Sequence, residues 1–144
     1  MLHNETVIEN NKNKIYFHFF YKYENYSAND EFFVKGRGES CFVNVSEIKL
    51  IFACAQYSEI ILTGNKIFRM RVSLKEWESK LPSEIFRRVH RSTIVNINFV
   101  ESHFQKRGQH FLRISNWVDN IEISKRKVKL MSDFANKSSI RLLL

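Results

Sequence analysis

The 144-residue chain has little of the residues that build linkers or membrane spans. It contains four glycines and one proline, which excludes linker-rich, collagen-like and low-complexity classes. No apolar run approaches the roughly 18 residues that a membrane span needs, and the start, MLHNETVIENNKNK, lacks the apolar core of a signal peptide. We therefore expect a cytoplasmic protein that makes no contact with a membrane.

Cysteine and histidine are also scarce. Cys41 and Cys54 each lie in an apolar stretch, so we expect two buried, reduced residues and no disulfide. The five histidines show none of the CxxC, HxxxH or HExxH spacings that would gather the roughly four ligands of a zinc site. We predict no metal and no other cofactor.

Basic residues are abundant and unevenly placed. Lys and Arg number 23 against 15 Asp and Glu, a formal net charge of +8. Residues 64–92 hold eight basic and three acidic side chains, residues 93–100 hold none, and residues 101–130 hold seven and three. Any single Lys or Arg is better explained as part of a solvated face. The clustering on two separate segments instead favours a polyanion or an acidic surface as the partner.

The apolar residues come in short runs rich in Phe, Val, Ile and Tyr, which predicts a mainly β, antiparallel framework. In the clearest hairpin, a two-residue Gly64-Asn65 loop supplies the positive φ of a tight turn. After it, apolar residues alternate with Arg69 and Arg71, so one strand face should be buried and the other cationic. The expected strands are Lys14 to Tyr21, Phe32 to Lys35, Cys41 to Val45, Ser58 to Thr63, Ile67 to Val72, Ile94 to Phe104, His110 to Ile114 and Asn120 to Ile123.

Two short helices are expected. The first begins at a capping box, Ser73-Leu74-Lys75-Glu76, and ends at Pro82. The second begins at Ser124 and places Val128, Met131 and Phe134 on one face. Its first turn is crowded with cations, which a helix start disfavours unless an anion such as phosphate compensates; the alternative is that they are solvated. These cations are Lys125, Arg126, Lys127 and Lys129.

The sequence gives no support for an enzyme. Gly36-Arg37-Gly38 resembles the start of a dinucleotide fingerprint, but Cys41 stands where the third glycine belongs, so a turn is the better interpretation. No phosphate-binding loop or nucleophile elbow occurs. His90 and His103 lie in a basic region, yet no pattern brings them together for acid and base catalysis.

The most informative segment is PSEIFRRVHRSTIVNINFV over residues 82–100, in which apolar residues alternate irregularly with arginine, histidine, serine and asparagine. Such anchored polar groups can read base edges and hold phosphates. The segment resembles the signature of the LytTR family of bacterial DNA-binding domains, Phe-x-Arg-Val-His-Arg-Ser-x-x-Val-Asn. The matching residues are Phe86, Arg88, Val89, His90, Arg91, Ser92, Val95 and Asn96.

The resemblance continues on both sides of the signature. Upstream it includes Tyr57, Ile60, Gly64-Asn65, Ser73-Leu74 and Leu81-Pro82, and downstream Ser124-Lys125-Arg126. It implies elongated antiparallel β-sheets with one or two short helices. It also implies a transcriptional regulator whose loops enter successive major grooves of double-stranded DNA at paired direct repeats, with a homodimer as one arrangement.

Carried over by position, the resemblance assigns base reading to Arg91 and Arg126. A third reading position falls in the loop after Phe52, where it corresponds to Glu59, whose carboxylate can accept from cytosine N4. Phosphate contacts are expected from Arg88, His90, Ser92, Lys125 and Lys127. His90 serves equally well as a buried support, and Asn96 is better explained as a support than as a contact.

The resemblance divides the chain into three parts. Residues 1–31 form a leader, partly disordered, with one extra strand; residues 32–136 form the LytTR-like domain; residues 137–144 form a C-terminal tail. The short leader leaves no room for a receiver domain, so we expect a stand-alone regulator or an excised domain. Trp117 is expected to pack on its own domain, with a partner contact as the alternative. The alternative function is a β-rich interaction module that binds an acidic protein.

Overall fold

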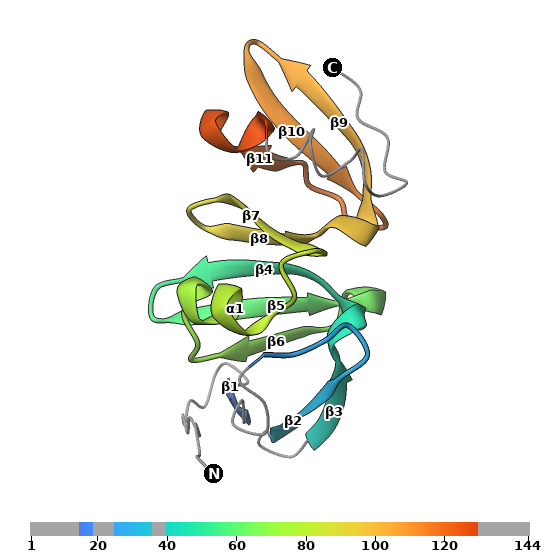
Figure 1. Cartoon of the computed structure of the whole chain (residues 1–144), viewed down its shortest axis with the longest axis vertical. Helices are drawn as coiled ribbons and strands as arrows, with labels where there is room; N and C mark the ends of the chain where they lie inside the picture. The colour runs from blue at the N-terminus through green and yellow to red at the C-terminus, as the bar shows by residue number, and fades with distance from the viewer. Residues whose placement is uncertain (1–14, 19–24, 36–39, 130–144) are drawn as a thin grey trace.

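The computed structural model describes residues 15–18, 25–35 and 40–129 (Figure 1). The expectations for residues 1–13, for the turn at 36–38, for Met131 and Phe134 and for the tail over 137–144 lie outside these ranges. The described strands are β1 Ile15–His18, β2 Glu31–Lys35, β3 Ser40–Asn44, β4 Ile48–Cys54, β5 Tyr57–Leu62, β6 Ile67–Met70, β7 Phe86–His90, β8 Thr93–Asn96, β9 Val100–Lys106, β10 Gln109–Ile114 and β11 Ile121–Ile123. The helical segments are α1 Leu74–Lys80 and the short 3-10 turns η1 Val45–Glu47, η2 Thr63–Asn65, η3 Ile97–Phe99 and η4 Lys125–Lys127.

Two sheets make up the fold. Eight strands form the larger sheet in the order β3-β2-β1-β6-β5-β4-β8-β7, and β9, β10 and β11 form the smaller one. The strands stack along the long axis of the molecule, with the smaller sheet beyond β7 (Figure 1). The expected elongated, mainly β architecture is thus confirmed. All described strand pairs are antiparallel except β1 with β6, which run parallel. The long chain segment between those two strands allows the crossover that a parallel pair needs.

Two strands next to the functional motif were not predicted. In β4, Ile48 to Ile51 are buried without interruption, Lys49 included, because the sheet is covered on both faces there. A strand buried on both faces shows no alternation of apolar and polar residues. In β7, the two buried residues Phe86 and Val89 are three positions apart, and the pairing with β8 shifts between Arg88 and His90. Neither strand therefore carries the period-two signal.

The segment expected as one strand over Ile94 to Phe104 is two strands in two different sheets. Asn96 ends β8, is fully buried and donates from Nδ2 to the Ile48 carbonyl at 2.8 Å. Its Oδ1 accepts from the Asn98 amide at 2.9 Å, which starts the 3-10 turn η3. Asn96 therefore supports the corner where the chain leaves the larger sheet for the smaller one.

The β5–β6 hairpin is confirmed, but its loop has three residues, not two. The Leu62 amide donates to the Lys66 carbonyl at 2.8 Å, so Thr63, Gly64 and Asn65 form the turn. Gly64 and Asn65 have φ values of +79° and +60°, the positive φ that this sequence predicts.

Helix α1 also follows its sequence pattern. Ser73 is the N-cap, and its hydroxyl accepts from the Glu76 amide at 3.0 Å. Leu74 and Trp77 are buried, as is Leu81 directly after the helix. The Trp77 indole donates to the Ser58 hydroxyl on β5 at 2.8 Å, which fixes α1 to the larger sheet.

Adjacent residues of the central strands point into two separate cores. Ile51 and Ile60 belong to the core that contains Trp77, under α1. Leu50 and Ile61 belong to the core that contains Leu112 and lies between the larger and the smaller sheet. The strands β4 and β5 thus lie between the two cores, and their central residues are buried on both faces of the sheet.

Trp117 packs against the second core, as expected for a residue of its own domain. Its ring centroid lies 6.1 Å from that of Phe52, and Lys49 Nζ lies 5.9 Å from the ring. Lys49 Nζ also donates to Asn65 Oδ1 at 2.8 Å and to the Asn116 carbonyl at 3.1 Å. Burial lowers the pKa of Lys49.

Candidate nucleic-acid interface

The β7–β8 hairpin presents the residues of the informative motif at one edge of the larger sheet. Phe86 anchors β7 in the first core and Val89 anchors it in the second. Arg91 and Ser92 form the turn, and Arg91 is exposed. The Ser92 carbonyl accepts from the Ala53 amide at 2.9 Å, so the β4–β5 turn lies beside the β7–β8 turn.

His90 holds the turn from inside. Its Nδ1 accepts from the Ser92 amide at 3.2 Å and lies 2.9 Å from the Ser92 hydroxyl. With Nδ1 engaged in this way, the remaining ring nitrogen, Nε2, is the one that can donate to a ligand. His90 thus makes the contacts of a support for the turn, one of the two alternatives expected for it.

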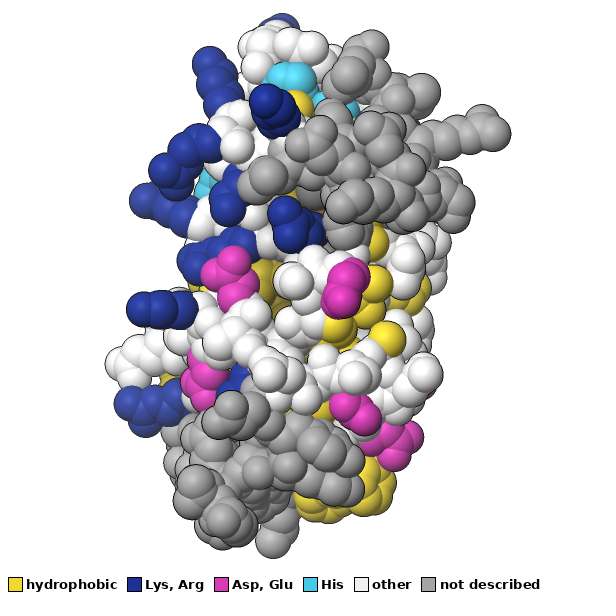
Figure 2. Space-filling view, viewed as in Figure 1, with side chains coloured by type: hydrophobic (Ala, Val, Ile, Leu, Met, Phe, Trp, Pro, Cys, Tyr) yellow, Lys and Arg dark blue, Asp and Glu magenta, His cyan; other side chains and the backbone are white. Residues whose placement is uncertain are grey.

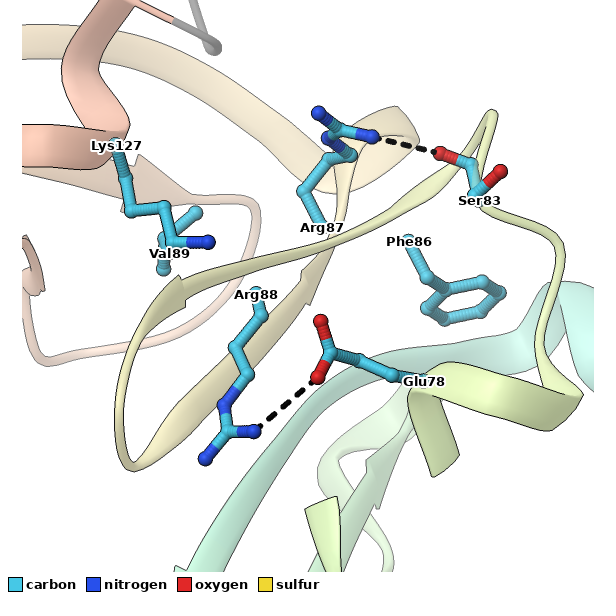
Figure 3. Close-up of a pocket in the computed structure, with 7 residues that line it drawn as sticks. All are labelled: Glu78, Ser83, Phe86, Arg87, Arg88, Val89 and Lys127. Atoms are coloured by element: carbon cyan, nitrogen blue, oxygen red, sulfur yellow. Dashed lines mark hydrogen bonds and ion pairs between the residues drawn. The ribbon is translucent and has the colours of Figure 1, made fainter. Parts of the chain in front are cut away.

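Arg88 is engaged within the protein. Its Nη1 lies 3.1 Å from Glu78 Oε1 on α1 (Figure 3), and its Nη2 donates to the Arg91 carbonyl. Its side chain is 27% exposed, and Nε is buried without a partner among the described residues. The sequence predicted only a phosphate contact for Arg88. It did not predict the ion pair with Glu78, because no local spacing links a helix residue to a strand residue ten positions later.

The turn η4 is docked on β7. The Ser124 amide donates to the Val89 carbonyl at 2.9 Å, and the Lys127 amide donates to the Ser124 carbonyl at 2.8 Å. Ser124 occupies the N-cap position as expected, but its side chain makes no capping hydrogen bond. Val128 packs against the second core, while Lys125 and Arg126 are exposed. The crowded cations thus project from a turn whose backbone is fixed to the hairpin strand.

Arg91 and Arg126, thirty-five positions apart in the sequence, line one groove of about 440 Å³. Among the described residues of its wall, Glu78 is the only acidic one, and it is paired with Arg88. Neither Arg91 nor Arg126 is paired with a carboxylate within the described part of the chain. The groove is lined by Glu78, Arg88, His90, Arg91, Ser124, Arg126 and Lys127.

A smaller pocket of about 140 Å³ adjoins the groove (Figure 3). Lys127 reaches over Val89 into this pocket, and Arg87 points away from Arg88, donating to the Ser83 carbonyl at 3.4 Å. The side chains of Arg87 and Arg88 therefore project from opposite sides of β7.

Positive charge is concentrated around the groove. Residues 25–85 carry eight basic and eight acidic side chains, whereas residues 86–129 carry ten and three. Figure 2 shows Lys and Arg side chains gathered along the left-hand edge of the upper half of the molecule. Two exposed basic residues at the tip of the β9–β10 hairpin, Lys106 and Arg107, were not selected by the sequence interpretation.

Glu59 lies apart from the turn in which a third reading position was expected. It is on β5, opposite Phe52 and Arg69, and its carboxylate accepts from Arg69 Nε at 3.2 Å and from Nη2. This bond raises the pKa of Arg69. The turn itself is at Ala55, with φ of +56°, and Gln56, both exposed.

Other features of the described residues complete the search for a site. Cys41 and Cys54 are not joined in a disulfide, and both are only partly buried. No three His, Cys, Asp or Glu side chains in these ranges come together as metal ligands would. None of their helical segments has the length and apolar character needed to span a bilayer. His103 pairs with His110, not with His90: His103 Nε2 lies 2.9 Å from His110 Nδ1.

Comparison with known proteins identifies the fold. The model of the LytTr DNA-binding domain matches residues 38–136. Among solved structures, the LytTr DNA-binding domain of a Bacillus cereus protein described as a methyl-accepting/DNA response regulator is similar, with a TM-score of 0.63 and 21% identity. The match covers 72% of this chain and 94% of that chain. A search of curated proteins finds no match. Because the family model spans well over half of the sequence, the chain belongs to the LytTR family of DNA-binding domains.

Proposed function

We propose that the chain is a sequence-specific DNA-binding transcriptional regulator that inserts the β7–β8 turn and the η4 turn into successive major grooves of promoter DNA. The observation that carries this proposal is the common groove of Arg91 and Arg126. Both guanidinium groups are exposed, and no carboxylate of the described residues neutralises either of them. An exposed guanidinium on a fixed backbone can bond guanine O6 and N7 together, which is the commonest base-specific contact.

Phosphate contacts would come from the groups around these two arginines. Lys125 and Lys127 flank Arg126, and His90 and Ser92 flank Arg91. Lysine is a flexible point charge and suits phosphate better than a base edge. We propose that Lys106 and Arg107, exposed at the tip of the β9–β10 hairpin, add to this set.

The β4–β5 turn is the third element at this edge. The bond from the Ala53 amide to the Ser92 carbonyl places it beside the β7–β8 turn, and both turns face the same side as η4 (Figure 1). Glu59 was expected to read a base from this segment, but Arg69 already engages its carboxylate. We propose that the exposed Gln56 at the tip of the turn is the better placed residue, since an amide can bond adenine.

A regulator of this kind acts where the bacterial chromosome is, so we infer a cytoplasmic location. The proposed target is a pair of direct repeats, each bound by one copy of the chain. This family of DNA-binding domains is not enzymatic, and no turnover of the DNA is expected.

The test begins with selection of bound fragments from random duplex DNA, because the operator is unknown. Affinities are then measured on the selected duplex and on a random duplex of equal length at several salt concentrations. Arg91→Ala should cost about 1–3 kcal/mol on the selected duplex and much less on the random one. Lys127→Ala should weaken both equally and reduce the salt slope by about 1, while the exposed Lys75→Ala on α1 should leave all values unchanged.

Two outcomes would contradict the proposal. Equal losses on both duplexes for Arg91→Ala would exclude base reading by this residue. Failure to enrich any sequence, together with weak and fully salt-sensitive binding, would instead favour the alternative, a β-rich module for an acidic protein.

A further inference from the structure

We propose that Arg88 is a positioning residue that sets the sequence specificity of the β7–β8 turn, and that it does not bind phosphate. The inference rests on the proposed function, because it assumes that Arg91 reads a base. It assigns to Arg88 a role different from the phosphate contact that the sequence suggests.

The contacts of Arg88 form a link from the protein core to the turn. Trp77 is fully buried and bonded to Ser58, which fixes α1 on the sheet. Glu78, the next residue on α1, has its Oε1 3.1 Å from Arg88 Nη1. Arg88 Nη2 then donates to the carbonyl of Arg91. The peptide group that follows the reading residue is therefore tied, through one planar guanidinium, to a buried tryptophan.

This link matters because the turn is exposed and short. Arg91 and Ser92 are the only residues between β7 and β8, so rotation of their shared peptide would redirect the Arg91 side chain. The Ser92 amide and carbonyl are held by His90 and by Ala53. Arg88 holds the Arg91 carbonyl. Its planar guanidinium loses little conformational freedom when it makes two hydrogen bonds at once.

The same geometry argues against phosphate binding by Arg88. Its two outer nitrogens are already engaged by protein acceptors, and Nε is buried. A phosphate close enough to bond this guanidinium would also approach the carboxylate of Glu78, which repels it. The exposed cations of η4 offer phosphate the same attraction without that repulsion.

The experiment compares two pairs of charge-matched variants on the selected and random duplexes. Arg88→Ala is paired with Arg87→Ala, which removes the same charge from the same strand on the opposite side. Arg88→Ala should lower the ratio of selected to random affinity by roughly 5- to 150-fold, the range that one bidentate base contact supplies, with an unchanged salt slope. Arg87→Ala should lower both affinities by a similar, small factor. Circular dichroism and thermal unfolding show that the variants are folded.

Glu78→Gln, paired with the exposed Glu84→Gln, tests the link without touching an arginine. Both variants remove one negative charge, so both should raise affinity for random DNA slightly. Only Glu78→Gln should lower the selected-to-random ratio, by roughly 1.5- to 5-fold, the range for a partly exposed ion pair. This second pair decides the question if Arg88→Ala does not fold.

The outcomes separate the two proposals. If Arg88→Ala weakens both duplexes equally and reduces the salt slope, as Lys127→Ala should, Arg88 binds phosphate and the inference is wrong. An equal ratio for Glu78→Gln and Glu84→Gln would also overturn it. If the wild-type protein prefers no sequence, the proposed function itself fails, independently of Arg88.

Discussion

Two histidines of the smaller sheet make the fold sensitive to acid. His103 on β9 is fully buried, and its Nε2 lies 2.9 Å from Nδ1 of His110 on β10, so one nitrogen donates and the other accepts. Burial and the neighbouring His110 lower the pKa of His103 from its ordinary value of 6.5. The unfolded chain therefore binds a proton at this residue before the folded chain does. The free energy of unfolding should fall as the pH drops below that ordinary value.

The magnitude follows from proton linkage. The loss of stability at pH 5.5 is at most about 1.4 kcal/mol, the limit for a folded chain that binds no proton at His103, whereas at pH 7.5 it is below about 0.1 kcal/mol. The assay is urea unfolding at both pH values for the wild type and for His103→Leu. The variant removes the titrating group and also a buried Nδ1 that has no partner among the described residues. The free energy of unfolding of His103→Leu should therefore change less between pH 7.5 and pH 5.5 than that of the wild type, by up to this amount.

A matched control comes from the same sheet. Phe111 on β10 carries no titratable group, so Phe111→Leu should keep the pH dependence of the wild type. If His103→Leu loses as much stability on acidification as the wild type does, the acid sensitivity arises elsewhere and the reasoning about the histidine pair is refuted.

Three further substitutions, each with a comparison variant, test two supports of the fold and the role of the β4–β5 turn in DNA binding. Trp77→Phe should lower the free energy of unfolding by about 1–3 kcal/mol in urea titrations, because it leaves the buried Ser58 hydroxyl unpaired; Trp117→Phe, whose indole nitrogen has no partner among the described residues, should cost less. Asn96→Ala should cost about 2–4 kcal/mol, since two bonds of a fully buried amide are lost, and the exposed Asn98→Ala should be near neutral in the same titration. Gln56→Ala should change the sequence selected from random DNA while Glu59→Gln leaves it unchanged; the reverse result would restore Glu59 as the reading residue.

The sequence predicts those parts of the fold that depend on local chemistry. The cap at Ser73 and the positive φ at Gly64 and Asn65 are read correctly because a single turn decides them. The strand β4 is missed because burial on both faces removes the alternation that would reveal it. The strand β7 is missed as well, because its two buried residues, Phe86 and Val89, are three positions apart and give no period-two signal.

The contacts of the site are less predictable than its residues. Arg91 and Arg126 are found from the motif, and the structure places them at one groove. The bond between Arg88 and Glu78 depends on how α1 lies on the sheet, which no spacing encodes. The pairing of His103 with His110 does leave a signal, since both flank the Arg107-Gly108 turn, but only once that hairpin is recognised.

The contacts that hold the β7–β8 turn and η4 converge on a single strand, β7. As the last strand of the larger sheet, it would expose unpaired backbone groups along its outer side, which is a site for unwanted pairing. The Ser124 amide fills one of these positions by bonding the Val89 carbonyl, so η4 covers this part of the edge. The same bond fixes Arg126 relative to Arg91, because Val89 lies two residues before Arg91 on β7. Protection of the sheet edge and the spacing of the two arginines therefore depend on one contact, and a change that loosens η4 should reduce sequence specificity before it unfolds the protein.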